Sequence, residues 1–147
     1  MTAEPIVVDD HLLLRILLDD EPPDLRPTGG QLFTTGLWYH RLCRSLTDHT
    51  VSGVFSQSLG GAHPTVAALA TESVTSLPDS VGLLSLRQLA WPMARLLSEG
   101  VRLNLMSLEA LAATEHLGAE LCVATADENP PLLAAAGARA APLRLIG

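Results

Sequence analysis

Cationic side chains are scarce in this chain. Lysine is absent, and 9 arginines face 16 acidic residues, which gives a formal net charge of -7 at pH 7. This balance argues against a broad phosphate-binding face. It does not exclude nucleic acid, because a few arginines around an acidic cleft, or a metal ion inside it, can hold a phosphate. The charge total therefore leaves that partner open.

Cysteines and long hydrophobic runs are also few. Cys43 and Cys122 are not spaced as a CxxC pair, so we expect buried thiols and no disulfide. No apolar stretch approaches the roughly 20 residues that a membrane span needs. The first ten residues have no basic region ahead of an apolar one and no small-residue cleavage site. We therefore expect a cytoplasmic protein with no membrane partner.

Two families of short motifs are missing as well. The histidines have no H-x-x-x-H or Cys-His pairing at zinc spacing, so a zinc site is not predicted. No Gly-x-Gly-x-x-Gly or P-loop pattern is present, and nucleotide-cofactor chemistry has no support.

Alternating apolar strands and helices are what the sequence does contain. Its 147 residues suffice for one domain with its own core, and no repeat or linker divides residues 1–147. Strands are predicted at 6–9, 81–86, 120–125 and 142–146. Helices are predicted at 12–18, from about 37, at 64–76, 87–100 with a break or kink at Pro92, 107–118 and 132–138. We predict an α/β fold with a central parallel sheet of about four to five strands flanked by helices.

The stretch "IVVDDHLLL" places two carboxylates directly after the first apolar strand. Asp9 or Asp10 can cap the helix that follows, which is a common use of aspartate at such a turn. Asp9 is the candidate for a metal ligand and Asp10 for the cap. His11 beside them either orients water near neutral pH or is simply hydrogen-bonded at the helix start.

More carboxylates are expected at the same edge of the sheet. Asp127 and Glu128 follow the strand at 120–125, and Glu109 lies in the first turn of the helix at 107–118. If the first and fourth strands are neighbours, Asp9, Glu109 and Asp127 converge on one cleft, because ligands bind at the carboxyl ends of parallel strands. Crowded carboxylates favour a cation, and oxygen ligands suit Mg²⁺ or Mn²⁺. The alternatives are a helix-dipole role for Glu109, a turn role for Asp127 and simple solvation of Glu128.

The segment "TTGLWYHRLCRSL" combines aromatic and basic side chains. Trp38 and Tyr39 beside Arg41 and Arg44 can stack on bases and hold phosphate, or the aromatics can pack in the core. We expect the aromatics in the core and the arginines in solvent.

The segments "IVVDDHLLLRILLDDEP" and "LNLMSLEALAATEHLGAELCVATADENPPL" resemble the two halves of PIN domains, especially VapC-type toxins. The resemblance implies a ribonuclease that hydrolyses RNA with water activated by Mg²⁺ or Mn²⁺. It assigns the catalytic and metal-ligand roles to Asp9, Glu109 and Asp127, with Asp10, His11 and Glu128 as auxiliary candidates. It also implies a homodimer and an antitoxin-like protein partner.

The chain departs from the family pattern at three places. Glu109 stands where the family usually has aspartate, and His11 where it usually has a serine or threonine. The family's helix glutamate has no acidic counterpart in "TTGLWYHRLCRSL". The second hypothesis is therefore a catalytically inactive PIN-like domain that binds protein or RNA, since a fold does not fix a function.

Overall fold

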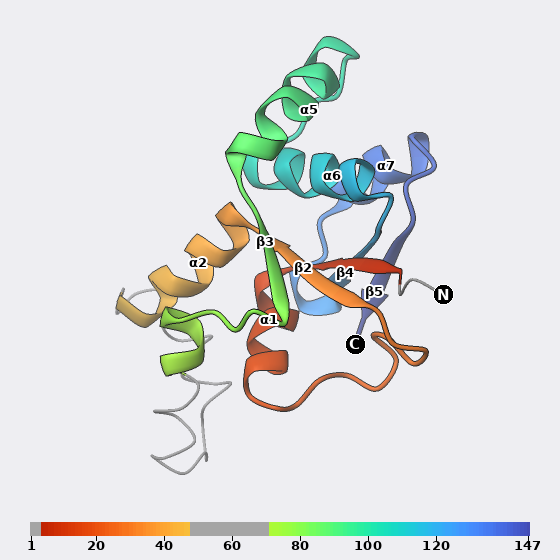
Figure 1. Ribbon diagram of the computed structural model, residues 1–147. Helices are drawn as coiled ribbons and strands as arrows, with labels where there is room; N and C mark the ends of the chain where they lie inside the picture. The colour runs from red at the N-terminus through yellow and green to blue at the C-terminus, as the bar shows by residue number, and fades with distance from the viewer. Residues whose placement is uncertain (1–3, 48–70) are drawn as a thin grey trace.

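A five-stranded parallel sheet forms the centre of the molecule, in the order β3-β2-β1-β4-β5 (Figure 1). The computed structural model describes residues 4–47 and 71–147. All four neighbouring strand pairs are parallel. The strands are β1 (Pro5–Val8), β2 (Gln31–Thr35), β3 (Val81–Leu84), β4 (Glu120–Ala124) and β5 (Leu143–Ile146). The predicted α/β fold with a parallel sheet flanked by helices is confirmed.

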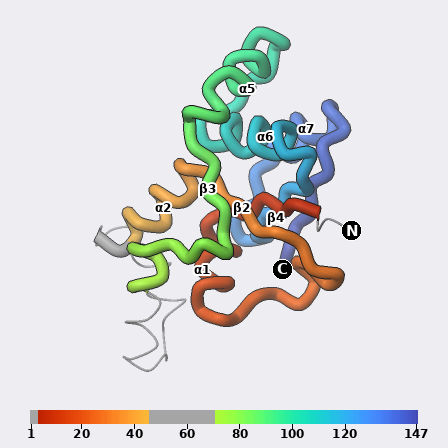
Figure 2. Tube along the Cα trace, in the orientation of Figure 1, coloured from red at the N-terminus to blue at the C-terminus, as the bar shows by residue number. Residues whose placement is uncertain are grey.

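Helices connect the strands, and Figure 2 traces the chain through them. They are α1 (Asp10–Leu17), α2 (Gly36–Thr47), α5 (Leu86–Ser98), α6 (Leu105–Leu117), the short 3₁₀ turn η1 (Thr125–Asp127) and α7 (Pro130–Ala138). In Figure 1, α6 and α7 lie above the sheet and α1 lies below it. The sheet is therefore covered on both faces, as its all-parallel topology requires.

The central strand β1 shows why both faces are apolar. Val7 points into one core cluster with side chains of α5, α6 and α7, while Ile6 and Val8 point into the other with side chains of α1 and α2. Successive side chains of a strand alternate between faces. A continuous apolar run is consequently what a strand buried on both sides needs.

Most predicted elements agree with these bounds. The strand β2 is the main addition, since residues 31–35 were not among the predicted strands. Helix α5 runs through Pro92 without interruption, and Gly100 follows its end at a φ of +92°, a conformation that suits glycine. The predicted loop at 51–64 and the helix at 64–76 lie outside the described residues as far as residue 70, while residues 71–75 are helical.

Parallel pairing brings the carboxyl ends of all five strands to one edge of the sheet. β1 pairs with β4, which is the arrangement under which the sequence predicted a shared cleft. Asp9 follows β1 at this edge, and η1 with Asp127 follows β4. None of the helices within the described ranges has the length and apolar character of a membrane span.

Candidate functional site

Asp9 joins three elements at the carboxyl edge of the sheet. Its side chain is fully buried. Oδ1 accepts a hydrogen bond from the Leu12 amide at 2.8 Å, and Oδ2 accepts one from the Ala124 amide at 2.9 Å. The prediction that Asp10 caps α1 was wrong: the helix begins at Asp10, and the cap is the residue before it, Asp9.

Burial raises the pKa of Asp9 from 3.8 to about 6, although the amides of Leu12 and Ala124 oppose part of that rise. The nearby Asp10 adds to the rise, and His11 opposes it. Desolvation disfavours the charged form of a carboxyl group, which is why burial dominates here.

Stability should therefore fall as pH rises through the window from about 4 to about 6. In this window the unfolded Asp9 loses its proton while the folded one keeps it, so rising pH favours the unfolded chain. The Asp9 contribution to the free energy of unfolding should drop on the order of 1–3 kcal/mol and stay level above pH 6. Urea unfolding at several pH values, compared with Asp9→Asn, isolates this slope. An identical slope in both proteins would contradict the assignment.

Glu109 is the second predicted ligand, and it holds the start of another helix. Helix α6 begins at Leu105, two residues before the predicted start, so Glu109 lies in its second turn and not in the first. The residue is 1% exposed. Its Oε1 accepts a hydrogen bond from the Leu37 amide at 2.8 Å. The carboxylate thus satisfies a free amide at the N-terminus of α2 and faces the positive end of that helix dipole.

Asp10 and Asp127 are brought together by an arginine from α2. Arg41 donates from Nε to Asp10 Oδ2 and from Nη2 to Asp10 Oδ1, both at 2.5 Å. The same Nη2 donates to Asp127 Oδ2 at 2.6 Å. The hydrogen bonds that Arg41 donates to Asp10, and then the one that it donates to Asp127, raise the pKa of Arg41, while burial opposes part of the rise. The prediction that Arg41 points into solvent was wrong, because two carboxylates draw its guanidinium to the sheet edge.

The neighbouring side chains of α2 follow the prediction more closely. Trp38 is buried in the core cluster with Val7, and Tyr39 is half-buried, with its hydroxyl donating to the Val74 carbonyl at 2.6 Å. Neither aromatic is therefore placed as an exposed stacking surface. The expected core role of the two aromatics is confirmed.

Asp10, His11 and Asp127 form a group that could hold a metal ion. Ligand atoms of the three lie within 4.8 Å of one another, and His11 Nε2 is 4.0 Å from Asp127 Oδ1. No other such group occurs within residues 4–47 and 71–147, so Asp9 and Glu109 do not join it. Glu128 is exposed, in line with the solvated alternative.

The group as it stands does not fit a resident Mg²⁺ or Mn²⁺. Such an ion needs carboxylate oxygens that are free to coordinate it. Three of the four carboxylate oxygens of Asp10 and Asp127 already accept from Arg41. The guanidinium supplies the positive charge that the crowded carboxylates need.

Arg41 was not among the predicted site residues, although the sequence carried a signal for it. It lies in the stretch "TTGLWYHRLCRSL", where PIN domains usually have a glutamate and this chain has no acidic residue. An arginine in that stretch, together with acids at two strand ends, indicated that a cation could pair with those acids. Its partners are 31 and 86 positions away along the chain, so no local pattern identifies them.

Comparison with known proteins adds no identification. No protein-family model matches the chain, and no curated protein matches it. The PIN-like assignment consequently depends on the quoted motifs and the order of the elements, and the function must be inferred from the site itself.

Proposed function

We propose that this chain is a PIN-like domain that acts by binding a partner macromolecule and does not hydrolyse RNA. The observation that carries the proposal is Arg41, which bonds both Asp10 and Asp127 at 2.5 to 2.6 Å. One guanidinium in this position neutralises the carboxylates that a divalent ion would otherwise bridge.

The roles of the other acids support the same proposal. Asp9 and Glu109 each accept hydrogen bonds from backbone amides and are buried. Asp127 keeps 34% of its side chain exposed, but Arg41 binds it. All three carboxylates that the resemblance assigns to catalysis are thus engaged in holding the fold or the arginine.

The space beside this cleft is also small. A cavity of about 70 Å³ adjoins Arg41 and Asp127, with Trp38, Ser107 and Asn129 among its other walls. Asn129 donates from Nδ2 to Ser107 Oγ at 2.7 Å across this wall. Such a volume holds a few water molecules.

Calorimetry with Mn²⁺ and a cleavage assay on mixed RNA test the proposal on the full chain. We expect no binding heat at millimolar Mn²⁺ and no RNA cleavage, because Arg41 holds the carboxylates. Micromolar Mn²⁺ binding, together with cleavage that disappears in Asp127→Asn, would contradict the proposal. Asp127→Asn is a better probe than a change at Asp9, whose carboxylate also caps α1.

The second candidate function is the metal-dependent ribonuclease that the resemblance implies. It is favoured by the proximity of Asp10, His11 and Asp127, whose ligand atoms lie within 4.8 Å of one another. It requires Arg41 to leave these carboxylates, which a substrate or partner would have to cause. The homodimer and the antitoxin-like partner remain predictions, and sedimentation of the purified chain tests the former.

A further inference from the structure

We propose that one exposed face of α5 binds single-stranded RNA. The inference rests on the proposed function, in which the domain acts by binding, and it names the partner. The α5 face is defined by Arg87, Trp91 and Arg95. These residues are spaced at i, i+4 and i+8, and a helix of 3.6 residues per turn brings that spacing to one side.

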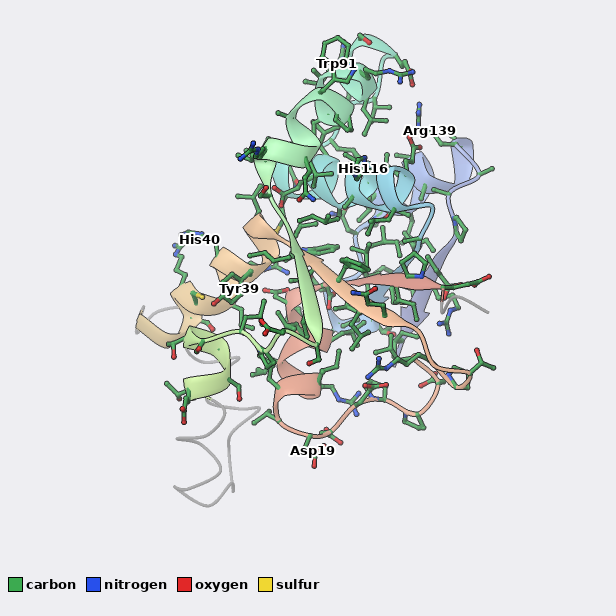
Figure 3. The ribbon with its side chains drawn as sticks, in the orientation of Figure 1. Asp19, Tyr39, His40, Trp91, His116 and Arg139 are labelled. Atoms are coloured by element: carbon green, nitrogen blue, oxygen red, sulfur yellow. The ribbon has the colours of Figure 1, made fainter. Side chains whose placement is uncertain are left out.

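Trp91 is exposed although α5 does not need it for packing. The helix buries Leu89, Met93 and Leu96, which contribute to the core cluster shared with α6. Trp91 is 73% exposed, whereas Trp38 is 3% exposed. Figure 3 shows Trp91 on α5, at the opposite end of the molecule from Asp19. Aromatic residues are enriched at binding interfaces relative to the rest of the protein surface.

The arginines of this face keep their charge available. Arg87 forms no ion pair with any residue in the described part of the chain, and Arg95 is 64% exposed, with Nη2 3.7 Å from Glu99 Oε1. Glu99 binds Arg139 more closely, at 2.7 Å, and Arg139 also binds Glu115 at 2.6 Å. Arg87, Arg95 and Arg139 outnumber Glu99 and Glu115 by one charge, so the α5 face carries a small positive charge on an acidic chain.

A groove beside Trp91 adds room for a base. It has a volume of about 260 Å³ between α5 and α6, and its walls carry two arginines, Arg95 and Arg139, and two carboxylates, Glu99 and Glu115, with His116 and Ala112 beside them. His116 lies on α6, and Figure 3 shows it below Trp91 and Arg139 in this view. The groove therefore places the exposed Arg95 guanidinium next to the Trp91 ring, while Arg139 is held by Glu99 and Glu115.

Single-stranded RNA matches this combination of groups. Its bases stack on an aromatic side chain, and its phosphates bind arginines that follow the backbone. Every base can stack on an aromatic ring, so we expect binding to depend little on the RNA sequence. A double helix would keep its bases stacked on one another and would not present a free base to Trp91.

The α5 face also starts at the edge of the sheet that carries the cleft. α5 follows β3 directly, and all strands are parallel. Leu86 therefore opens the helix at the same sheet edge as Asp10, Arg41 and Asp127. In Figure 1, α5 extends from that edge away from the sheet, so RNA on its exposed face would not enter the cleft.

Fluorescence anisotropy with a labelled oligouridylate of about 12 nucleotides tests the inference in EDTA and at low salt. EDTA removes divalent ions, so cleavage cannot interfere, and the outcome is independent of whether the cleft is catalytic. We expect micromolar binding that weakens with salt, and quenching of the exposed Trp91 fluorescence. Trp91→Ala should weaken binding roughly ten- to hundredfold, whereas Trp91→Phe should retain most of it.

Arg87→Ala and Arg95→Ala should each reduce the slope of log affinity against log salt by about 0.7. Arg15→Ala is the control, because Arg15 is a partly exposed arginine on α1 that pairs with Asp20, and its loss should leave the affinity unchanged. Binding that is absent, or equal in Trp91→Ala and wild type, would overturn the inference. A dimer that dissociates in Trp91→Ala, without RNA binding, would assign the face to a second copy and would also overturn it.

Discussion

Replacing Arg41 with alanine should let Mn²⁺ bind at micromolar concentrations between Asp10 and Asp127. The substitution leaves Asp10 and Asp127 without their shared cation while their oxygens stay close to His11. Two carboxylates and an imidazole are a donor set that suits Mn²⁺. We expect the affinity measured by calorimetry to rise at least a hundredfold over the wild type.

The same variant should be less stable in EDTA. Arg41 bonds both carboxylates while about a third of its side chain is exposed, so we expect a loss of about 1–3 kcal/mol in the free energy of unfolding. Mn²⁺ at 100 times its dissociation constant should restore about 2.7 kcal/mol. Stabilisation by metal in the variant, and none in the wild type, is the diagnostic pattern.

Arg26→Ala is a closely matched control for this experiment. Arg26 has the same side-chain exposure as Arg41, 31%, and forms a bidentate pair with Glu21, but it lies in the loop between α1 and β2. Its removal should create no Mn²⁺ site. Equal Mn²⁺ affinity in wild type and Arg41→Ala would show that the guanidinium does not close the cleft.

Glu109→Ala should lower the free energy of unfolding by about 3 kcal/mol or more. The change removes a buried side chain and leaves a cavity. It also leaves the Leu37 amide at the start of α2 without its acceptor. Urea unfolding followed by circular dichroism measures the loss.

Glu109→Gln separates a structural role from metal binding. Glutamine keeps an amide oxygen where Oε1 accepts from Leu37, so we expect its stability to lie within about 1 kcal/mol of the wild type. A metal ligand would instead tolerate glutamine poorly, because the charge is lost. Glu120→Ala is the control: Glu120 pairs with Arg144 at a partly exposed site, and its loss should cost about 1 kcal/mol or less. A small effect of Glu109→Ala would contradict the capping role.

The fold was largely predictable because buried strands and helices have recognisable patterns of apolar residues in the sequence. β1 and β4 are apolar runs that end in acids, and the helices between strands carry their own periodicity. β2 was missed since its sequence "QLFTT" has an exposed Gln31 at its start and only a short apolar part. Its position between β1 and β3, and not its own composition, makes it a strand.

The site was less predictable because each acid is held by a partner far along the chain. Asp9 bonds an amide 115 positions away, and Glu109 one that is 72 positions away. Helical periodicity distinguishes side chains that face the core from those that face solvent. Arg41 does neither, because its guanidinium faces the edge of the sheet. The sequence could therefore indicate where the acids gather and could not indicate what neutralises them.

The position of β1 in the middle of the sheet has a consequence for the chain during its synthesis. This first strand leaves the ribosome early, but one of its two neighbours, β4, is made more than 100 residues later. Until then one side of β1 remains an open edge, and the Asp9 carboxylate lacks the Ala124 amide. Nascent or truncated chains that stop before β4 should thus be prone to association through that edge, and folding of the sheet should complete only after β4 has emerged.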